Sequence, residues 1–273
     1  MGQIEVEGLR IAYERVGHGP PLVLLHGFVG DGRSTWQRQI DDLSEDFTVI
    51  AWDAPGAGRS SDPPESFRMS DYADCLAGFV ATLGLRRPHV AGISFGGALA
   101  LELYRRHSTL PATLILAGAY AGWAGSLPAD VVEQRLEQCL RWSQLAPTEF
   151  VTTMLPSMFS KSAPKERIDE FAASVAEFHP VGFRAMALAS ADADLRDVLP
   201  RIDVPTLVLC GDEDVRAPLD VAEALHIAIP AARLVVMAGV GHVSSVEAAE
   251  RFNVEVRAFL GASLRATDGT GRR

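Results

Sequence analysis

Short apolar runs alternate with segments of helical periodicity along most of this chain. The runs are Leu22–Leu25, Phe47–Trp52, Pro88–Ala91, Thr113–Ala117, Thr206–Cys210 and Arg233–Met237. Strands without polar alternation are typical of a parallel sheet that is buried on both faces, with helices as the cover. Together with a hairpin predicted at Ile4–Val6 and Ile11–Val16, the pattern predicts an α/β fold.

The alternation stops between residues 124 and 196. That segment has only helical periodicity, interrupted by five prolines, which predicts four short helices inserted as one block. We expect residues 1–123 and 197–262 to form one core domain and residues 124–196 to form a lid. The last predicted helix covers roughly residues 248–260, and residues 263–273 are expected to be a flexible tail.

Composition narrows the classes of partner. The 273 residues carry a formal net charge of −10 and include three widely separated cysteines. A protein that binds nucleic acid needs a positive surface, so the charge argues against that partner. The cysteines have no metal-like spacing, no run is long enough to cross a membrane, and the first residues lack the pattern of a secretory signal. We therefore expect a cytoplasmic monomer or homodimer that contacts neither membrane nor nucleic acid.

Ser94 occupies the apex of a predicted turn between a strand and a helix. The pentapeptide Gly92-Ile93-Ser94-Phe95-Gly96 follows one apolar run and precedes a helical segment. A serine at so sharp a reversal adopts a strained backbone, and the flanking glycines relieve crowding because they carry no Cβ. The pattern predicts a hydroxyl raised out of the sheet at a helix N-terminus, where developing negative charge is stabilised.

A serine hydroxyl needs a base to become a nucleophile, and the base needs a carboxylate to orient it. In an open parallel sheet, such partners come from the carboxyl ends of later strands. Three adjacent acids, Asp212, Glu213 and Asp214, follow one late strand, and His242 follows the last. The residues alone leave the choice among the three acids open.

Five motifs in this order resemble the α/β-hydrolase superfamily. They are His26-Gly27-Phe28, the turn Asp53–Ser60, the pentapeptide Gly92–Gly96, the loop Gly211–Asp214 followed by Pro218, and Gly241-His242. The likeness covers nearly the whole chain. It implies the α/β-hydrolase fold, with a mostly parallel eight-stranded sheet, helices on both faces and an inserted helical lid.

The resemblance also implies roles for individual residues. Ser94 is expected to be the nucleophile, His242 the base and Asp214 the acid that orients the ring. The backbone N–H groups of Phe28 and Phe95 are expected to form the oxyanion hole. This chemistry implies neither a metal nor an organic cofactor.

Three further polar residues are expected to have structural roles. His26 should form hydrogen bonds within its own loop and shape the oxyanion hole. Asp53 and Arg59 should hold the turn in which they lie.

We call the strand-to-helix turn at Gly92–Gly96 the nucleophile elbow. A serine rather than an aspartate at its apex favours hydrolysis of a carboxylic ester or lactone of a small molecule through an acyl-enzyme. The segment from Pro180 to Pro205 and the stretch before His242 resemble the 3-oxoadipate enol-lactonases and their esterase-like relatives, so an enol-lactone is one candidate substrate. Four residues are expected to contact the substrate: Trp123, Trp142, Phe183 and Val243.

Two alternatives stay open. One is a C–C bond hydrolase that acts on a dienoate ring-cleavage product, and the other is a ligand receptor that keeps the triad without turnover. A carboxylate on the substrate would require a buried cation. The lid offers Arg135, Arg141 and Arg184, although each is more typical of a solvated helix face.

Overall fold

The computed structural model describes the backbone of residues 1–270 and the side chains of residues 1–265. Within these residues, eight strands form one sheet in the order β1-β2-β4-β3-β5-β6-β7-β8. Their bounds are β1 Gly2–Val6, β2 Leu9–Val16, β3 Pro21–Leu25, β4 Thr48–Trp52, β5 His89–Ile93, β6 Thr113–Ala117, β7 Thr206–Gly211 and β8 Arg233–Met237. The β1–β2 and β2–β4 pairs are antiparallel and the other pairs are parallel, which confirms the predicted mostly parallel sheet.

The strands at the centre of the sheet are apolar because both of their faces are covered. Every residue of β4, β5, β6 and β7 is buried. The edge strand β8 is exposed at Arg233 and Val236, as expected of a strand with only one neighbour. The hydrophobic core therefore lies on both sides of one continuous sheet.

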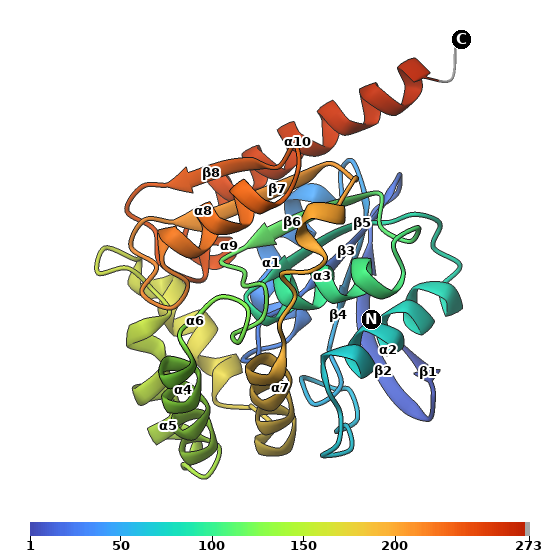
Figure 1. Ribbon diagram of the computed structural model, residues 1–273. Helices are drawn as coiled ribbons and strands as arrows, with labels where there is room; N and C mark the ends of the chain where they lie inside the picture. Colours follow the sequence, from blue (N-terminus) through green and yellow to red (C-terminus); the bar gives the residue numbers. More distant parts are fainter. Residues whose placement is uncertain (271–273) are drawn as a thin grey trace.

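The order of the strands decides which helices share a face. The core helices are α1 Gly32–Leu43, α2 Met69–Thr82, α3 Phe95–Arg106, α8 Leu219–Ala228, α9 Ser244–Glu247 and α10 Ala249–Thr270. The chain crosses from β3 to β4 in one direction and then from β4 through β5, β6 and β7 to β8 in the other. Because parallel crossovers are right-handed, α1 lies on the face opposite α2, α3 and α8. α10 packs against α1, so helices cover both faces (Figure 1).

Between β6 and β7 the chain forms only helical structure. This segment contains α4 Ala129–Trp142, α5 Pro147–Met154, the 3₁₀ turn η1 Leu155–Ser157, α6 Lys165–Val175 and α7 Pro180–Asp192. The four predicted short helices are thus confirmed, and they gather at one end of the sheet (Figure 1). We call residues 124–196 the helical insertion.

The direction in which the chain adds strands reverses at β3, which lies between β4 and β5. The chain leaves β3 toward β4, and it later places β5 on the other side of β3. In open α/β sheets, ligands bind beyond the carboxyl ends of the strands at such a reversal. The residues that follow these two strands are His26–Phe28 and Ser94, so two of the five motifs meet at this point.

The C-terminal helix is longer than predicted. α10 continues to Thr270, ten residues beyond the predicted end near Leu260. Leu260 is buried, and Leu264, one turn further, packs against the core, which gives this part of the extension an apolar contact. The remainder of the predicted tail, residues 271–273, lies outside the described residues.

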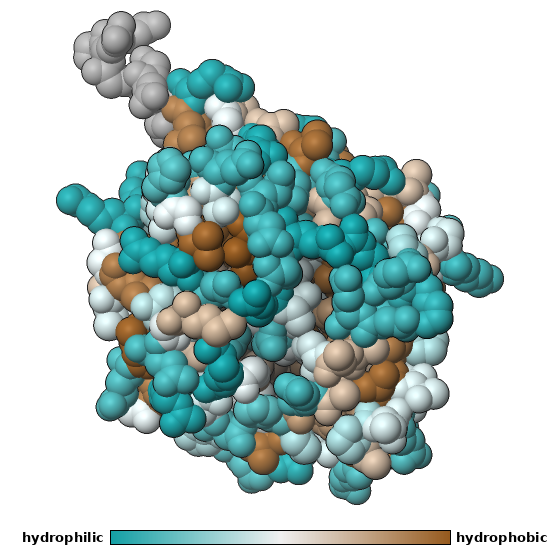
Figure 2. Space-filling model, turned by 180° about the vertical axis from the view of Figure 1, so that it is seen from behind, coloured by the Kyte–Doolittle hydropathy of each residue, from teal (hydrophilic) through white to brown (hydrophobic). Residues whose placement is uncertain are grey.

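The face of the molecule opposite the view of Figure 1 is mostly polar. Apolar residues on it form small, separate areas between hydrophilic side chains (Figure 2). No helix among the described residues has the length and apolarity required to cross a membrane.

Candidate active site

Ser94 joins β5 to α3 in a backbone conformation that residues with a side chain rarely adopt. Its φ is 54° and its ψ is −114°, and it is the N-cap of α3. The Ser94 N–H donates to the carbonyl of Ala117 on β6 over 2.9 Å, which continues the sheet into the turn. Such strain persists where the surrounding structure fixes the chain, and it is typical of functional sites.

The two glycines beside Ser94 allow three backbone segments to approach closely. A Cβ on Gly92 would lie closer than 3.0 Å to the carbonyl of Gly96, and a Cβ on Gly96 would lie that close to the carbonyl of Leu25 on β3. No side chain can be accommodated at either position without moving backbone. The elbow therefore depends on glycine for space, as the sequence predicted.

His242 and Asp214 form a buried pair beside Ser94. The His242 Nδ1–H donates to Asp214 Oδ2 over 2.8 Å, and both side chains are almost fully buried. His242 and Ser94 line the same cavity. The other ring nitrogen, Nε2, has no hydrogen-bond partner among the described residues. The ring therefore retains an acceptor in a cavity that also contains the serine.

The loop after β7 holds the Asp214 carboxylate as an anion. Burial raises its pKa, but the charge and hydrogen bond of His242 and the N–H groups of Ala217 and Arg216 lower it by more, so the pKa lies below its usual value. These two N–H groups donate to Oδ1 over 2.8 Å each. Of the three adjacent acids, Asp214 is the one that contacts His242, because the Asp212 carboxylate accepts the Gly239 N–H instead.

Gly118 at the end of β6 makes room for this pair, and the sequence analysis did not identify it. Its φ is +48°, and a Cβ at this position would lie 3.1 Å from His242 Nδ1 and 3.2 Å from Asp214 Oδ2. A side chain here would press on the hydrogen bond that orients the imidazole. A glycine directly after a buried strand was the only signal in the sequence.

Two backbone N–H groups next to Ser94 are available to a ligand. Phe95 is the first residue of α3, and Phe28 follows Gly27, whose Cβ position would be 3.7 Å from Ser94 Cβ. Neither the Phe28 N–H nor the Phe95 N–H has a hydrogen-bond partner among the described residues. Both loops that the sequence assigned to the oxyanion hole thus adjoin Ser94.

The cavity at Ser94 is narrow and is lined by residues from the core and from the helical insertion. Its lining comprises Gly27, Phe28, Val29, Thr35, Ile93, Ser94, Met158, Phe171, His242 and Val243. The free volume is about 10 Å³. That is room for about one water molecule. A substrate therefore enters only when lining side chains such as Met158 or Phe171 move.

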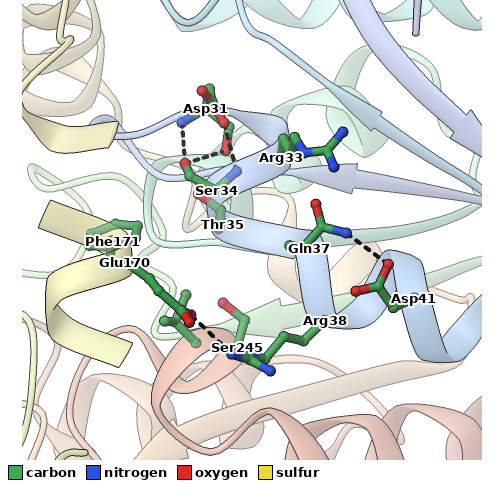
Figure 3. Close-up of a pocket in the computed structure, with 11 residues that line it drawn as sticks. Asp31, Arg33, Ser34, Thr35, Gln37, Arg38, Asp41, Glu170, Phe171 and Ser245 are labelled. Atoms are coloured by element: carbon green, nitrogen blue, oxygen red, sulfur yellow. Dashed lines mark hydrogen bonds and ion pairs between the residues drawn. The ribbon is translucent and has the colours of Figure 1, made fainter. Parts of the chain in front are cut away.

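A polar cleft of about 440 Å³ lies next to this cavity and shares Thr35 and Phe171 with it. The cleft lies between α1, α6 and α9, and an ion pair joins Arg38 of α1 to Glu170 of α6 over 2.9 Å (Figure 3). Ser174 of α6 also donates to the Ser34 hydroxyl of α1. Phe171 thus borders both the wide cleft and the narrow cavity at Ser94.

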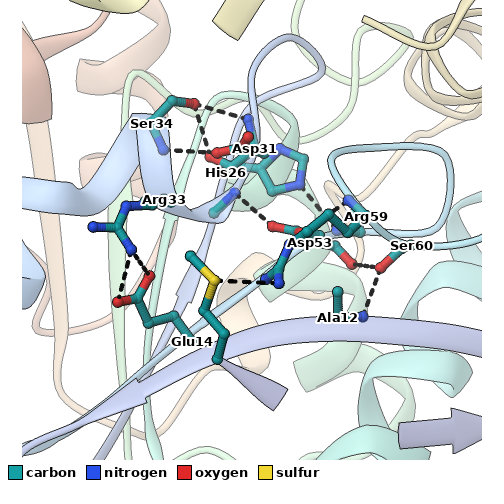
Figure 4. A network of polar contacts seen from close by, with 12 residues as sticks. Ala12, Glu14, His26, Asp31, Arg33, Ser34, Asp53, Arg59 and Ser60 are labelled. Atoms are coloured by element: carbon teal, nitrogen blue, oxygen red, sulfur yellow. Dashed lines mark hydrogen bonds and ion pairs between the residues drawn. The ribbon is translucent and has the colours of Figure 1, made fainter. Parts of the chain in front are cut away.

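His26 shapes the loop at the carboxyl end of β3. Its Nδ1–H donates to the carbonyl of Gly27 over 2.5 Å, and its Nε2 accepts the N–H of Ala54 over 3.0 Å (Figure 4). Burial lowers the pKa of His26, which keeps the ring neutral as this bonding requires. Both nitrogens are used for structure, as predicted.

Asp53 holds the turn that follows β4. Its carboxylate accepts the N–H groups of Gly32 and Arg59, and its carbonyl accepts the hydroxyl of Ser60 (Figure 4). Burial raises the pKa of Asp53, whereas its hydrogen bonds act in the opposite direction. These contacts agree with the turn-holding role expected of Asp53 and Arg59.

Glu247 joins the loop of His242 to the helical insertion, and no motif pointed to it. The Glu247 carboxylate accepts the N–H of Gly241 over 3.0 Å and the N–H of Ser160 over 3.1 Å, and it also accepts the hydroxyl of Ser160. Close by, the N–H of Val243 donates to the carbonyl of Met158. One buried carboxylate therefore fixes the backbone on both sides of the site.

The four residues expected to contact the substrate lie at different distances from the cavity. Val243 lines it. Trp123 and Phe183 pack on the ring of Phe28, with centroids 6.1 and 5.2 Å away. Trp142 is partly buried at the end of α4 and is not part of the lining.

No group of three or more His, Cys, Asp or Glu side chains within the described part of the chain is arranged to hold a metal ion. Cys75, Cys139 and Cys210 are buried and unpaired. Burial raises the pKa of the Cys75 thiol to about 12 and those of Cys139 and Cys210 to about 11. These thiols are inert core groups.

The chain is similar to known proteins over most of its length. A model of the alpha/beta hydrolase family matches residues 22–255. The chain belongs to the alpha/beta hydrolase family. A relative named putative carbamate hydrolase RutD, from Cronobacter turicensis, is 30% identical over 93% of this chain and 96% of its own length.

Solved structures of alpha/beta hydrolases superimpose closely on the chain. A thermophilic esterase from Thermogutta terrifontis, with malate bound, has a TM-score of 0.89 and 30% identity, and the match covers 96% of this chain and 99% of the esterase. The enol-lactonase from Burkholderia xenovorans LB400 has a TM-score of 0.87 and 25% identity, over 95% and 100% of the two chains. The predicted superfamily, fold and hydrolase class are confirmed.

Proposed function

We propose that this protein hydrolyses a carboxylic ester or lactone of a small molecule through an acyl-enzyme on Ser94. The observation that carries the proposal is the buried His242–Asp214 hydrogen bond, which shares a cavity with a serine held at a strained strand-to-helix turn. A neutral imidazole with its Nδ1–H on a carboxylate has Nε2 available to take the hydroxyl proton.

In the proposed reaction, His242 Nε2 removes the Ser94 proton as Oγ attacks the ester carbonyl. The Asp214 carboxylate keeps the ring in the required tautomer and stabilises the imidazolium that forms. The oxyanion accepts hydrogen bonds from the N–H groups of Phe28 and Phe95, which lack other partners among the described residues. His242 then protonates the leaving alcohol, and water hydrolyses the acyl-enzyme by the reverse sequence of proton transfers.

The helical insertion acts in this proposal as a lid. Met158 and Phe171 from the insertion line a cavity too small for a substrate, and the adjoining cleft offers a path once Phe171 moves. Exclusion of water strengthens the electrostatic stabilisation of the oxyanion. Val243 in the lining, with Trp123 and Phe183 behind Phe28, would then contact the acyl group, and Trp142 is proposed to contribute from the outer part of the lid.

The names of similar proteins support an attack at a carbonyl. They include an esterase, an enol-lactonase and a putative carbamate hydrolase. An activity screen tests the proposal, with p-nitrophenyl acetate and butyrate, lactones and a dienoate as substrates. We expect turnover of esters or lactones that Ser94→Ala abolishes and that a serine-directed phosphonate blocks. Thermal shifts with these ligands and no turnover would indicate a receptor instead, and turnover of the dienoate alone would indicate a C–C hydrolase.

A further inference from the structure

The loop after β7 carries a buried guanidinium that the proposed reaction does not use. Arg216 is 9% exposed, and its backbone N–H donates to Asp214 Oδ1, so the loop that orients the acid also fixes this arginine. In its side chain, Nη1 donates to the hydroxyl of Ser157 over 2.9 Å and lies 3.5 Å from the sulfur of Met154. Its Nε and Nη2 make no hydrogen bond among the described residues.

A second arginine, Arg135 of α4, approaches the same loop. Its Nη1 and Nη2 each donate to the Arg216 carbonyl over 3.2 Å, and Nη1 also donates to the Tyr120 hydroxyl over 2.7 Å. Its guanidinium carbon lies 5.6 Å from the ring centroids of both Tyr120 and Trp123. Among the described residues, neither arginine forms an ion pair with a carboxylate, in contrast to Arg141 and Arg184, which pair with exposed glutamates.

The guanidinium of Arg216 is buried without a direct ion-pair partner among the described residues, and Arg135 beside it is half-buried. Removal of a charge from water costs more than contacts with aromatic rings return. Burial lowers the pKa of Arg216, and the neighbouring charge of Arg135 acts in the same direction. Tyr120, Cys139 and the Asp214 carboxylate act in the opposite direction and offset only part of the decrease in this pKa. A bound anion would stabilise the charged side chains and raise the pKa of Arg216. The excess of positive charge is local to these two arginines, because the chain as a whole carries a net charge of −10.

The arginine also lies against the wall of the Ser94 cavity. Its guanidinium carbon is 5.5 Å from the ring centroid of Phe28, and Phe28 lines the cavity. Arg216 is not itself part of the cavity lining, so a substrate that reaches the guanidinium from Ser94 has to extend past the ring of Phe28. The planar fork of arginine matches the two oxygens of a carboxylate.

We propose that Arg216, with Arg135 beside it, forms a subsite for a free carboxylate of the substrate, so that the preferred substrates are esters or lactones that carry a second, ionised carboxylate. This inference rests on the proposed hydrolysis at Ser94 and adds the substrate class. Of the three arginines that the sequence offered for such a role, Arg135 is in place. Arg216, which lies outside the insertion, supplies the more buried cation.

A pair of esters with the same alcohol and similar shape tests the subsite. Monoethyl succinate carries a carboxylate where ethyl 4-methylpentanoate carries two methyl groups, and a pH-stat follows both reactions. We expect the wild-type kcat/KM to favour monoethyl succinate. Arg216→Gln should reduce that preference by about 10- to 100-fold, the usual effect of losing a charge-assisted hydrogen bond. Arg216→Lys should restore part of it, and Arg141→Gln, which removes an exposed charge of the same helix as Arg135, should leave it unchanged.

A binding measurement separates this inference from the proposed reaction. In the Ser94→Ala variant, succinate should raise the Tm and succinamide should not, and Arg216→Gln added to this variant should remove the shift. If the wild type hydrolyses the neutral ester through Ser94 but shows no preference that depends on Arg216, the subsite is wrong and the proposed reaction stands. If neither ester is hydrolysed, the proposed reaction fails for this substrate class, and the succinate shift alone decides whether the anion subsite exists.

Discussion

The core domain and the helical insertion determine the candidate site in different ways. In the core, backbone geometry fixes the position of Ser94, because Gly92 and Gly96 allow main chains to approach closer than any side chain permits. The insertion lines the cavity with the side chains of Met158 and Phe171, and its main chain contacts the loop of His242 through the Met158 carbonyl. The positions of the reacting groups therefore depend on the backbone of the core, whereas access of the substrate to Ser94 depends on side chains that can be replaced.

The largest effect should come from the pair that orients the base. Asp214→Asn should reduce kcat by about 10⁴-fold, because an amide can hold the imidazole in the wrong tautomer while the geometry is kept. Steady-state kinetics on the best ester of the screen measures this loss. Asp212→Asn is the matched control, since that acid bonds to Gly239 and should lose little activity. Equal losses in both variants would contradict the assignment of the acid.

The second prediction tests whether backbone contacts, rather than side-chain contacts, fix the position of Ser94. Gly96→Ala should lower the free energy of unfolding by about 1–3 kcal/mol, the usual cost of overpacking, and should also reduce activity. Gly261→Ala in α10, where an added Cβ meets only the tip of Arg265 at 3.6 Å, is the control and should not destabilise the protein. Denaturant unfolding measures both. An elbow that tolerates alanine without loss would show that backbone contact does not fix Ser94.

These two predictions concern the parts of the site that were predictable from sequence. The glycines and Ser94 follow a buried strand, and spacing alone brought His242 and the acids to the same edge of the sheet. Spacing alone left the choice among the three adjacent acids open, and the resemblance of the loop Gly211–Asp214 to the family motif assigned the role to Asp214, which is the acid that contacts His242. Motifs identify these residues because the backbone conformation at the elbow permits only a few residue types.

The remaining features of the site had no sequence signal that could be recognised. Glu247 lies in a four-residue helix, and its role depends on contact with Ser160, which is 87 residues away in the chain. Arg216 and Arg135 come together only because the insertion folds back on the loop after β7. Such contacts depend on packing between distant segments. The same reason explains why Trp142, although aromatic and in the insertion, does not line the cavity.

A third, smaller effect concerns the strand that leads to Ser94. Burial lowers the pKa of His89 on β5 to about 4, so the folded state keeps the ring neutral while the unfolded chain binds a proton below about pH 6.5. Stability should therefore fall as the pH decreases from 6.5 toward 4, by about 2 kcal/mol at pH 5 from this group. His89→Asn, which can still bond to Thr113, should flatten this part of the profile. Urea unfolding at pH 7 and pH 5 measures the free energy of unfolding, and an equal pH dependence in the wild type and in His89→Asn would contradict the buried neutral ring.

The smallest effect should come from the insertion. Phe171→Ala should open the cavity toward the cleft and increase kcat/KM for bulky esters by about 10-fold or less, with little change for acetate esters. Phe178→Ala is the control, because that ring stacks on Phe150 in the insertion and is not part of the cavity lining. If both variants change the ester profile alike, general loosening of the insertion rather than a gate at Phe171 determines access.

Covalent labelling shows whether Ser94 is the nucleophile and whether His242 activates it. The wild-type protein is treated with a fluorophosphonate, and intact-mass and peptide mass spectrometry locate the adduct. We expect one phosphonyl group per chain on Ser94, strongly slowed labelling in His242→Ala and none in Ser94→Ala. A label on another residue, or ester turnover that persists undiminished in Ser94→Ala, would contradict the role of Ser94 as the nucleophile.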